Sequence, residues 1–323
     1  PTDIVLVLDQ SGSMAESFQT SSTSGYQKLN ISENSEAYSN RDNLYYFNGQ
    51  NYVKVSVSRE VTWDGYRYTY SWNGQTAISY GRNESIPSPL KGNLYRYTTT
   101  TTTTSKQQAL KDAVTEFVNS VQAQAQEDGV DHRIAMVGFA SDNSRSGWST
   151  LNYGNTELLS TTAVVNYRNA TNSDYKNSLV SVNSNGTVNS RLTTAIDRID
   201  AEGGTAINLG MEMAQNILNN NPVSSGEERN QVVIVFTDGE PGIFTSDSDS
   251  TRTNDYANPA ISTAKAIKDK GVKVYSVGIF DGADANAAVD TTTTSWSNVK
   301  TTNRFMHYLS SNYPNAQSMS NGG

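Results

Sequence analysis

The sequence predicts an α/β fold, namely a doubly wound, mostly parallel sheet with helices on both faces. Three observations predict it. Short, continuous apolar runs recur along the chain, as in strands that are buried on both faces of a parallel sheet. Segments with apolar residues at helical spacing lie between these runs. The two signals alternate in chain order, which is the pattern of strand–helix–strand units.

Four apolar runs are interpreted as core strands: Ile4–Leu8, Arg133–Phe139, Gln231–Thr237 and Val272–Ile279. Helices are expected between and after them. The first follows Ser105, a suitable N-cap, and two more carry the apolar residues of 192–199 and 210–218. A fourth covers 258–270 and ends at Gly271, and the last begins near Phe305.

Two long segments do not fit this alternation and are predicted to be β-rich arms inserted into one domain of residues 1–323. The first, residues 15–104, holds 11 of the 18 tyrosines and two Asn-Gly pairs at 48–49 and 73–74. Asn-Gly between alternating aromatic and polar residues is a strong hairpin signal. The second, residues 141–187, is polar with scattered aromatic residues. A disordered linker is the alternative, which the aromatic content disfavours.

Composition excludes several function classes. The formal charge is −8 without a basic cluster, which argues against nucleic acid and anionic membranes as partners. The absence of cysteine removes disulfides, zinc–thiolate sites and cysteine nucleophiles, and two histidines leave little for histidine catalysis. No Ser–His–Asp set is evident, so the protein is not expected to be an enzyme. Ser, Thr and Asn make up 108 residues, a third of the chain, which fits a secreted or wall-attached bacterial protein.

Oxygen-bearing side chains follow the predicted strands. Asp9, Ser11 and Ser13 lie at alternate positions in a turn directly after the first strand. Asp238 ends the third strand, and Thr205 follows a Gly-Gly pair before a helix. Ligand sites of doubly wound sheets lie beyond the carboxyl ends of the strands, so these loops can meet there. Two carboxylates and three hydroxyls, without nitrogen or sulfur, suit Mg²⁺, Mn²⁺ or Ca²⁺.

These motifs resemble those of a von Willebrand factor A domain with a complete metal-ion-dependent adhesion site. The resemblance covers residues 1–14, about 105–140 and about 188–315, and assigns Asp9, Ser11, Ser13, Thr205 and Asp238 as metal ligands. More narrowly, the chain is similar to tip adhesins of sortase-assembled Gram-positive pili, which carry two inserted arms and a closing segment like residues 305–314. The resemblance implies that Thr205 and Asp238 exchange direct for water-mediated metal contact between two conformers.

The expected function is therefore metal-dependent cell adhesion at a pilus tip or cell wall, with Mg²⁺ favoured as the ion. The ion would bridge to an acidic side chain of a host matrix or cell-surface protein, and the rest of a longer chain would contact other pilin subunits. In one alternative, the arm aromatics bind a glycan and the metal is structural. A metal-dependent hydrolase is a more remote alternative. No apolar run approaches the roughly 20 residues of a membrane span, so no membrane insertion is expected from this segment.

Overall fold

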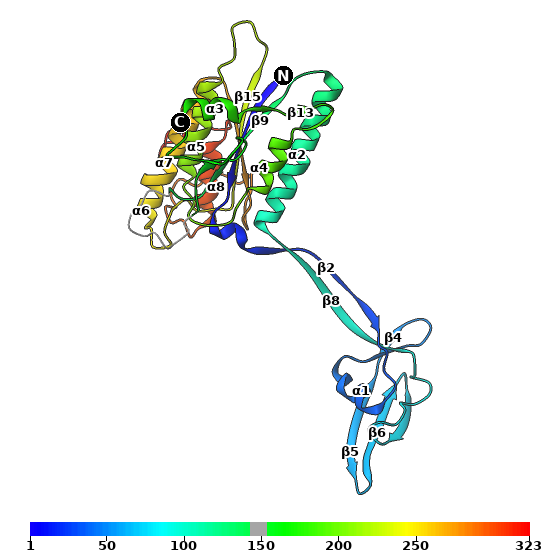
Figure 1. Cartoon of the computed structure of the whole chain (residues 1–323). Coiled ribbons are helices and arrows are strands. Elements are labelled where there is room, and N and C mark those ends of the chain that lie inside the picture. The colour runs from blue at the N-terminus through cyan, green and yellow to red at the C-terminus, as the bar shows by residue number, and fades with distance from the viewer. Residues whose placement is uncertain (143–153) are drawn as a thin grey trace. The chain divides into compact units, whose positions relative to one another are not determined.

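The computed structural model describes residues 1–142 and 154–323 and divides the chain into two compact units. Unit 1 comprises Pro1–Phe18 and Thr104–Gly323, and unit 2 comprises Gln19–Thr103 (Figure 1). In these described ranges, no helix is long and apolar enough to cross a membrane.

Unit 1 is built on one mixed sheet with the strand order β11-β10-β9-β1-β15-β16, and β12 also pairs with β9. Its central strands β9, β1, β15 and β16 run parallel, whereas β10 and β12 pair antiparallel with β9. The strands are β1 (Thr2–Asp9), β9 (Arg133–Phe139), β10 (Glu157–Leu158), β11 (Val165–Asn166), β12 (Val180–Ser181), β15 (Asn230–Thr237) and β16 (Lys273–Gly278), with a small separate pair of β13 (Asn183–Ser184) and β14 (Thr187–Val188).

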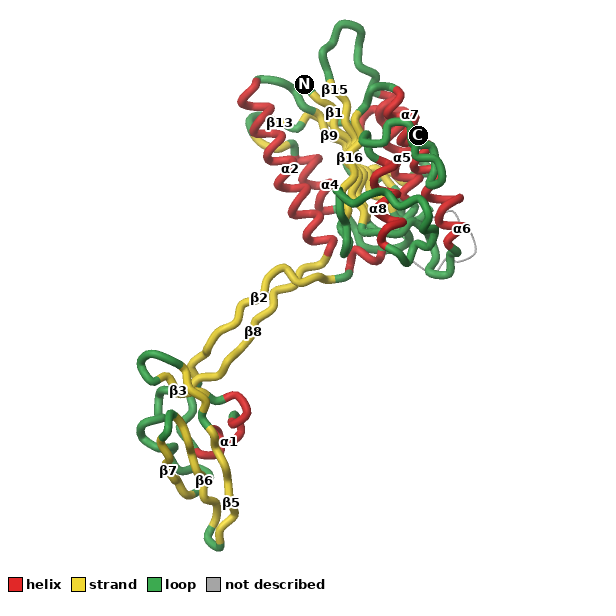
Figure 2. The backbone as a smooth tube through the Cα atoms, turned by 180° about the vertical axis from the view of Figure 1, so that it is seen from behind, coloured by secondary structure: helices red, strands yellow, loops and turns green. Residues whose placement is uncertain are grey.

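Helices cover both faces of this sheet, as Figure 2 shows from behind. They are η1 (Gly12–Ala15), α2 (Lys106–Asp128), α3 (Asn172–Ser178), α4 (Ser190–Asp197), α5 (Ile207–Asn220), α6 (Asp249–Thr251), η3 (Arg252–Ala257), α7 (Asn258–Asp269) and α8 (Val299–Leu309). Alternate residues of β1 pack on opposite faces: Val5 and Val7 contact the core under α5 and α7, and Ile4, Leu6 and Leu8 contact the core under α2 and α4. The predicted doubly wound α/β class is therefore confirmed.

Local signals explain where the helices begin and end. The side chain of Ser105 accepts a hydrogen bond from the Gln108 backbone and caps α2, which ends at the left-handed Gly129. The last helix begins at Val299, before the expected start near Phe305, because Asn298 caps it and its first turn is polar. A polar first turn carries no apolar periodicity, so the sequence pattern revealed only the second half of α8.

The described parts of the predicted second arm, residues 141–142 and 154–187, belong to unit 1 and do not form a unit of their own. Strands β10 and β12 extend the main sheet beside β9, and α3 packs near α5. Leu158 and Leu159 are fully buried on opposite faces of the sheet. Residues 143–153, which include Trp148, lie outside the described residues.

Unit 2 has a core of its own between two small antiparallel sheets, β2-β8-β3-β4 and β5-β6-β7. Both Asn-Gly pairs lie in hairpin turns, and Asn73 and Gly74 have φ values of 46° and 75°, as a type I′ turn requires. The elements are β2 (Ser17–Lys28), α1 (Asn34–Ser39), η2 (Arg41–Asn43), β3 (Tyr45–Phe47), β4 (Tyr52–Lys54), β5 (Ser56–Thr62), β6 (Gly65–Trp72), β7 (Gln75–Tyr80) and β8 (Leu94–Ser105).

Candidate metal centre

The carboxyl end of β1 carries three of the predicted ligands in one hydrogen-bonded group. Asp9 ends the strand and is fully buried. Its Oδ1 accepts hydrogen bonds from the Ser11 backbone at 2.9 Å and from Ser11 Oγ at 2.5 Å. Ser11 Oγ lies 3.2 Å from Ser13 Oγ, within the short helix η1 and its cap. The turn after β1 therefore gathers one carboxylate and two hydroxyls.

The neighbouring strand β15 adds the second predicted carboxylate. Because β1 and β15 pair in parallel, with Leu8 opposite Phe236, their carboxyl ends lie side by side. Thr237 Oγ1 donates to Asp9 Oδ2 at 2.9 Å, and the Asp238 backbone N–H donates to the same oxygen at 3.1 Å. Thr237 was not singled out by the sequence, although a hydroxyl beside Asp238 at a strand end was a visible signal.

This arrangement places the acidic side chains of Asp9 and Asp238 near each other, where little solvent reaches them. Burial, together with the charge of Asp238, raises the pKa of Asp9 to about 7, although hydrogen bonds from Ser11 and from the Asp238 backbone act to lower it. A buried carboxylate beside a second carboxylate is costly unless a cation compensates it. The oxygen-only donor set, with two carboxylates beside each other, therefore fits a hard divalent cation.

Lys106 is a site residue that sequence reasoning missed. Lys106 is the first residue of α2. Its Nζ lies 3.2 Å from Asp238 Oδ2 and 3.0 Å from Glu16 Oε2. Burial lowers the pKa of Lys106, but its bond to Glu16 and the charge of Asp238 raise it more, so the pKa lies above its usual value. A lysine in the first turn opposes the helix dipole, and that conflict was a signal for a nearby acid.

The loop of Thr205 is joined to the turn after β1 through the backbone. Gly12 N–H donates to the Gly203 carbonyl at 2.9 Å, and Thr205 and Gly242 exchange two backbone hydrogen bonds. A Cβ on Gly204 would lie 2.6 Å from Ile243 Cα, so the loop needs glycine there. In the described ranges, the hydrogen bonds of Thr205 run through its backbone, and none joins its hydroxyl to Asp9, Ser11 or Ser13.

Comparison with known proteins identifies the fold family. Residues 163–320 match the family model of the von Willebrand factor type A domain. The chain carries a von Willebrand factor A domain. None of the curated proteins compared with the chain matches it.

Solved structures similar to this chain include three of pilus proteins. Two structures of the pilus adhesin SpaC from Lactobacillus rhamnosus GG, one in an open conformation, are 15% identical with a TM-score of 0.37 and cover 84% and 86% of this chain. The chain spans 32% and 34% of those two SpaC chains, about a third of their length. A mutant PilB minor pilin from Streptococcus sanguinis is 12% identical with a TM-score of 0.34, over 81% of this chain and 77% of that one.

A hollow of about 440 Å³ opens beside the candidate centre of the von Willebrand factor A domain. Acidic and basic side chains both line it. The lining includes Glu16, Asp238, Glu240, Lys106 and Arg252, together with Ser13. Ser13 and Asp238 line the hollow, whereas Asp9 lies fully buried behind them. A partner group that enters the hollow can therefore reach the outer side of the proposed ligand set.

An acidic residue elsewhere in the domain has a structural role. Asp247, in the acidic Ser246–Ser250 loop, accepts backbone hydrogen bonds from Ile243 and Phe244 at 2.9 Å. In the described part of the chain, no three His, Cys, Asp or Glu side chains gather to hold a metal.

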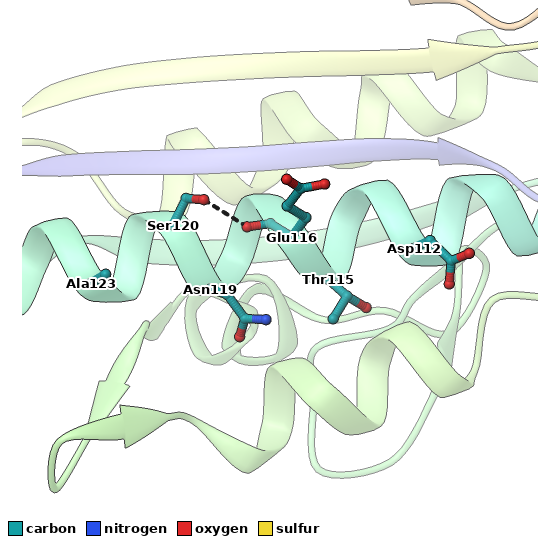
Figure 3. A pocket seen from close by; sticks show the side chains of 6 residues that line it. All are labelled: Asp112, Thr115, Glu116, Asn119, Ser120 and Ala123. Atoms are coloured by element: carbon teal, nitrogen blue, oxygen red, sulfur yellow. Dashed lines mark hydrogen bonds between the residues drawn. The ribbon is translucent and has the colours of Figure 1, made fainter.

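A second hollow, of about 460 Å³, follows one face of α2 (Figure 3). Asp112, Glu116 and Ser120 are labelled along it, and Ser120 Oγ donates to the Glu116 carbonyl at 2.9 Å. Its residues recur at helical spacing on a single helix, so their side chains lie in a row and do not converge on one point.

Proposed function

We propose that this domain is a metal-dependent adhesion module that binds an acidic side chain of a host matrix or cell-surface protein through a divalent cation. Mg²⁺ is the expected ion, with Mn²⁺ and Ca²⁺ as alternatives. The hydrogen-bonded group at the end of β1 carries the proposal, because carboxylate and hydroxyl oxygens are the ligands that hard cations prefer. The proposed ligands are Asp9, Ser11, Ser13, Thr205 and Asp238.

Each residue has a distinct part in this proposal. Asp9 is oriented by four hydrogen bonds, two at each carboxylate oxygen, so its geometry is fixed before a cation arrives. Thr205 lies on a loop that is bonded to the Asp9 turn but keeps its hydroxyl out of that network. Thr205 and Asp238 would exchange direct and water-mediated contact with the ion. The bound cation supplies positive charge to the partner's carboxylate.

Lys106 competes with the metal for Asp238 in this proposal. Its ammonium already bonds the Asp238 carboxylate, and it has a second acid, Glu16, to which it can remain bonded. When Asp238 turns toward the cation, Lys106 would keep the Glu16 contact at the edge of the hollow. Lys106→Met should therefore tighten Mg²⁺ binding severalfold.

The cellular setting follows from the same proposal. An adhesion module of this kind acts outside the cell, at a pilus tip or anchored to the cell wall of a Gram-positive bacterium. The remainder of a longer chain would make the contacts with other pilin subunits. Binding, and not bond cleavage, is the proposed outcome of metal coordination.

Titration calorimetry of the protein with Mg²⁺, Mn²⁺ and Ca²⁺ tests the metal site directly. We expect one ion per chain, and Asp9→Ala should weaken binding by roughly 100-fold or more. Asp269→Ala is the matched control, because Asp269 is an exposed carboxylate paired with Lys265 on α7. Wild-type affinity in Asp9→Ala, or equal loss in both variants, would contradict the site.

Adhesion to immobilised host matrix proteins tests the function. Binding should be lost in EDTA, restored by Mg²⁺, and lost in Asp9→Ala. It should survive replacement of Trp63, an exposed aromatic of unit 2. The opposite pattern, with EDTA without effect, would reject the metal bridge as the adhesive contact.

A further inference from the structure

Unit 2 carries a continuous stack of alternating arginine and tyrosine side chains. The Arg41 guanidinium lies 4.2 Å from the centre of the Tyr38 ring, and Arg59 lies 4.4 Å from the same ring. Arg59 also lies 4.9 Å from the Tyr66 ring, which Arg82 contacts at 5.5 Å. We call these five residues the arginine–tyrosine ladder. It joins α1, η2, β5, β6 and the turn after β7 in one row.

The three guanidinium groups are exposed and carry unneutralised charge. In the described part of the chain, none of them forms an ion pair with a carboxylate. Two acidic residues near the ladder in sequence are engaged elsewhere, and within the described residues Asp42 and Glu84 form no ion pair with its arginines. Glu60 follows Arg59 but pairs with Arg67 on the other face of the β5–β6 hairpin, and Glu36 accepts backbone hydrogen bonds at the start of α1. The ladder is therefore a row of positive charge without an internal partner.

The ladder stands out against the charge of the rest of the molecule. Unit 2 contains eight Lys or Arg and six Asp or Glu, a net charge of +2, although the whole chain is at −8. The remaining 16 basic and 26 acidic residues give unit 1 a net charge of −10. Three of the eight basic residues of unit 2 are in the ladder. An anionic partner is thus attracted to this surface of unit 2 and repelled by unit 1.

Stacking on a ring prepares each guanidinium for an oxyanion. A guanidinium that lies over an aromatic ring can keep N–H groups at its edge available, and the contact limits its rotation. In Arg41 one of these groups, Nη1, donates to the Tyr38 carbonyl at 2.9 Å, and the others have no partner among the described residues. Sulfate and carboxylate groups match that edge with two parallel hydrogen bonds. A row of such groups, each separated from the next by one ring, fits a polymer with anions at regular intervals better than it fits a single small anion.

We propose that the arginine–tyrosine ladder binds an anionic polysaccharide that carries sulfate or carboxylate groups. Each of the two ladder rings already lies between two guanidinium groups, so the arginines, and not the rings, would contact the polymer. The direction of the row favours a polysaccharide over an acidic peptide. It crosses β5, β6 and the end of β7, whereas a bound peptide strand would follow the edge of a sheet to use its backbone hydrogen bonds.

This binding does not depend on the proposed metal site, which lies in unit 1. The experiment therefore uses the full chain in EDTA, with heparin as the probe and surface plasmon resonance as the readout. The triple variant Arg41→Gln, Arg59→Gln, Arg82→Gln should bind heparin roughly tenfold more weakly or worse. The matched control replaces Lys28, Lys91 and Arg96, three exposed basic residues of unit 2 outside the ladder, by glutamine. The affinity of this control variant for heparin should fall less than threefold. An equal loss of affinity in both variants would overturn the proposal.

Two further comparisons separate the ladder from simple charge attraction. The triple Arg→Lys variant keeps the charge but loses the stacked, two-pronged geometry, so we expect binding clearly weaker than wild type. Full affinity in that variant would overturn the role of the ladder. Polyglutamate of matched charge should bind more weakly than heparin, and stronger binding would assign the surface to acidic peptides and reject the polysaccharide. If the triple variant lowers the melting temperature, the single variant Arg82→Gln, in the turn after β7, takes its place. It should also weaken heparin binding, and full affinity would overturn the proposal.

Discussion

Unit 1 contains four charged residues that are buried as a whole, whereas unit 2 contains none in the residues that the structure describes. The four are Asp3, Asp9, Lys268 and Arg304. Asp3 is bonded by two arginines, and Lys268 and Arg304 donate to backbone carbonyls. Asp9 differs from them, because its charged neighbour is a second carboxylate. Buried charge with a fixed partner serves the fold, and buried charge without one marks the candidate metal centre.

Unit 2 keeps its charges at the surface and places aromatic rings under some of them. Its buried polar side chain in the described residues is the uncharged Asn34, bonded by Tyr70. Interactions between exposed charges are weak and sensitive to salt, whereas buried charges are strong and costly to disturb. The comparison predicts that equivalent charge changes have large effects in unit 1 and small effects in unit 2.

The largest expected effect is the loss of the buried acid at the start of β1. Asp3 accepts two hydrogen bonds from Arg133, at 2.7 and 2.8 Å, and one from Arg229 at 3.0 Å. Asp3→Asn removes the countercharge of Arg133 and one of the two countercharges of Arg229, which keeps Glu227, and should lower the free energy of unfolding by about 3–5 kcal/mol. Urea denaturation followed by far-ultraviolet circular dichroism measures it. A loss below about 1 kcal/mol, as for an exposed pair, would remove the distinction between the units.

Much of unit 1 could be predicted because its strands are buried on both faces. Apolar runs such as Ile4–Leu8 and Arg133–Phe139 need no knowledge of their partners to be recognised. Strands β10 and β12 are two residues long and lie within polar sequence, so no period could reveal that they extend the sheet. Their position is set by pairing with β9, which is a tertiary contact.

The candidate site shows the same division. Asp9, Ser11 and Ser13 are close in sequence, and Asp238 ends a recognisable strand, so spacing and topology sufficed to bring them together. Lys106 lies 132 residues from the carboxylate that it bonds, and only folding brings it there. The ladder was likewise hidden, because its arginines are far apart in sequence and lie in no recognisable motif.

A matched pair of tyrosines in unit 2 gives the next effect. Tyr70 and Tyr68 are both fully buried on β6. Tyr70 donates to Asn34 Oδ1 at 2.7 Å, whereas the Tyr68 hydroxyl has no hydrogen-bond partner among the described residues. Tyr70→Phe leaves the buried Asn34 oxygen without its donor and should lower the free energy of unfolding by about 1–3 kcal/mol. Tyr68→Phe should be neutral or stabilising. Thermal melting of both variants measures the difference, and equal losses would contradict the hydrogen-bond argument.

The next expected effect is a change with pH in the free energy of unfolding of unit 1, of about 1–2 kcal/mol, which is caused by Lys268. Burial, with a smaller contribution from the charge of Lys265, lowers the pKa of Lys268 to about 8. Between pH 8 and the unfolded value near 10.5, the unfolded chain holds a proton that the folded chain has released. Lys268 therefore makes stability rise as pH increases from 7.5 to 9.5. Lys268→Met should remove this rise relative to wild type, in urea denaturation at both pH values.

The Lys268 substitution has a second consequence that serves as its control. Nζ donates to the carbonyls of Tyr308, Ser310 and Tyr313, at 3.0, 3.1 and 2.9 Å. Methionine leaves these carbonyls unbonded at every pH, so the variant should be less stable than wild type already at pH 7.5, and the difference should be larger at pH 9.5, where the wild type has gained stability. Lys265, which is partly buried, makes the smaller contribution to the lowered pKa of Lys268, so Lys265→Met should keep most of the pH dependence. A variant as pH-dependent as wild type would show that Lys268 stays charged throughout.

The smallest expected effect concerns the ion pair of Glu60 and Arg67 on the β5–β6 hairpin. Glu60 is 60% exposed and Arg67 is 38% exposed, so water and salt screen their attraction. Glu60→Gln should change the free energy of unfolding of unit 2 by less than about 1 kcal/mol, and 0.5 M salt should shrink even that difference. Thermal melting at low and high salt measures it. A salt-independent loss comparable to that of Asp3→Asn would mean that unit 2 also relies on charge held away from water, and the contrast between the two units would fail.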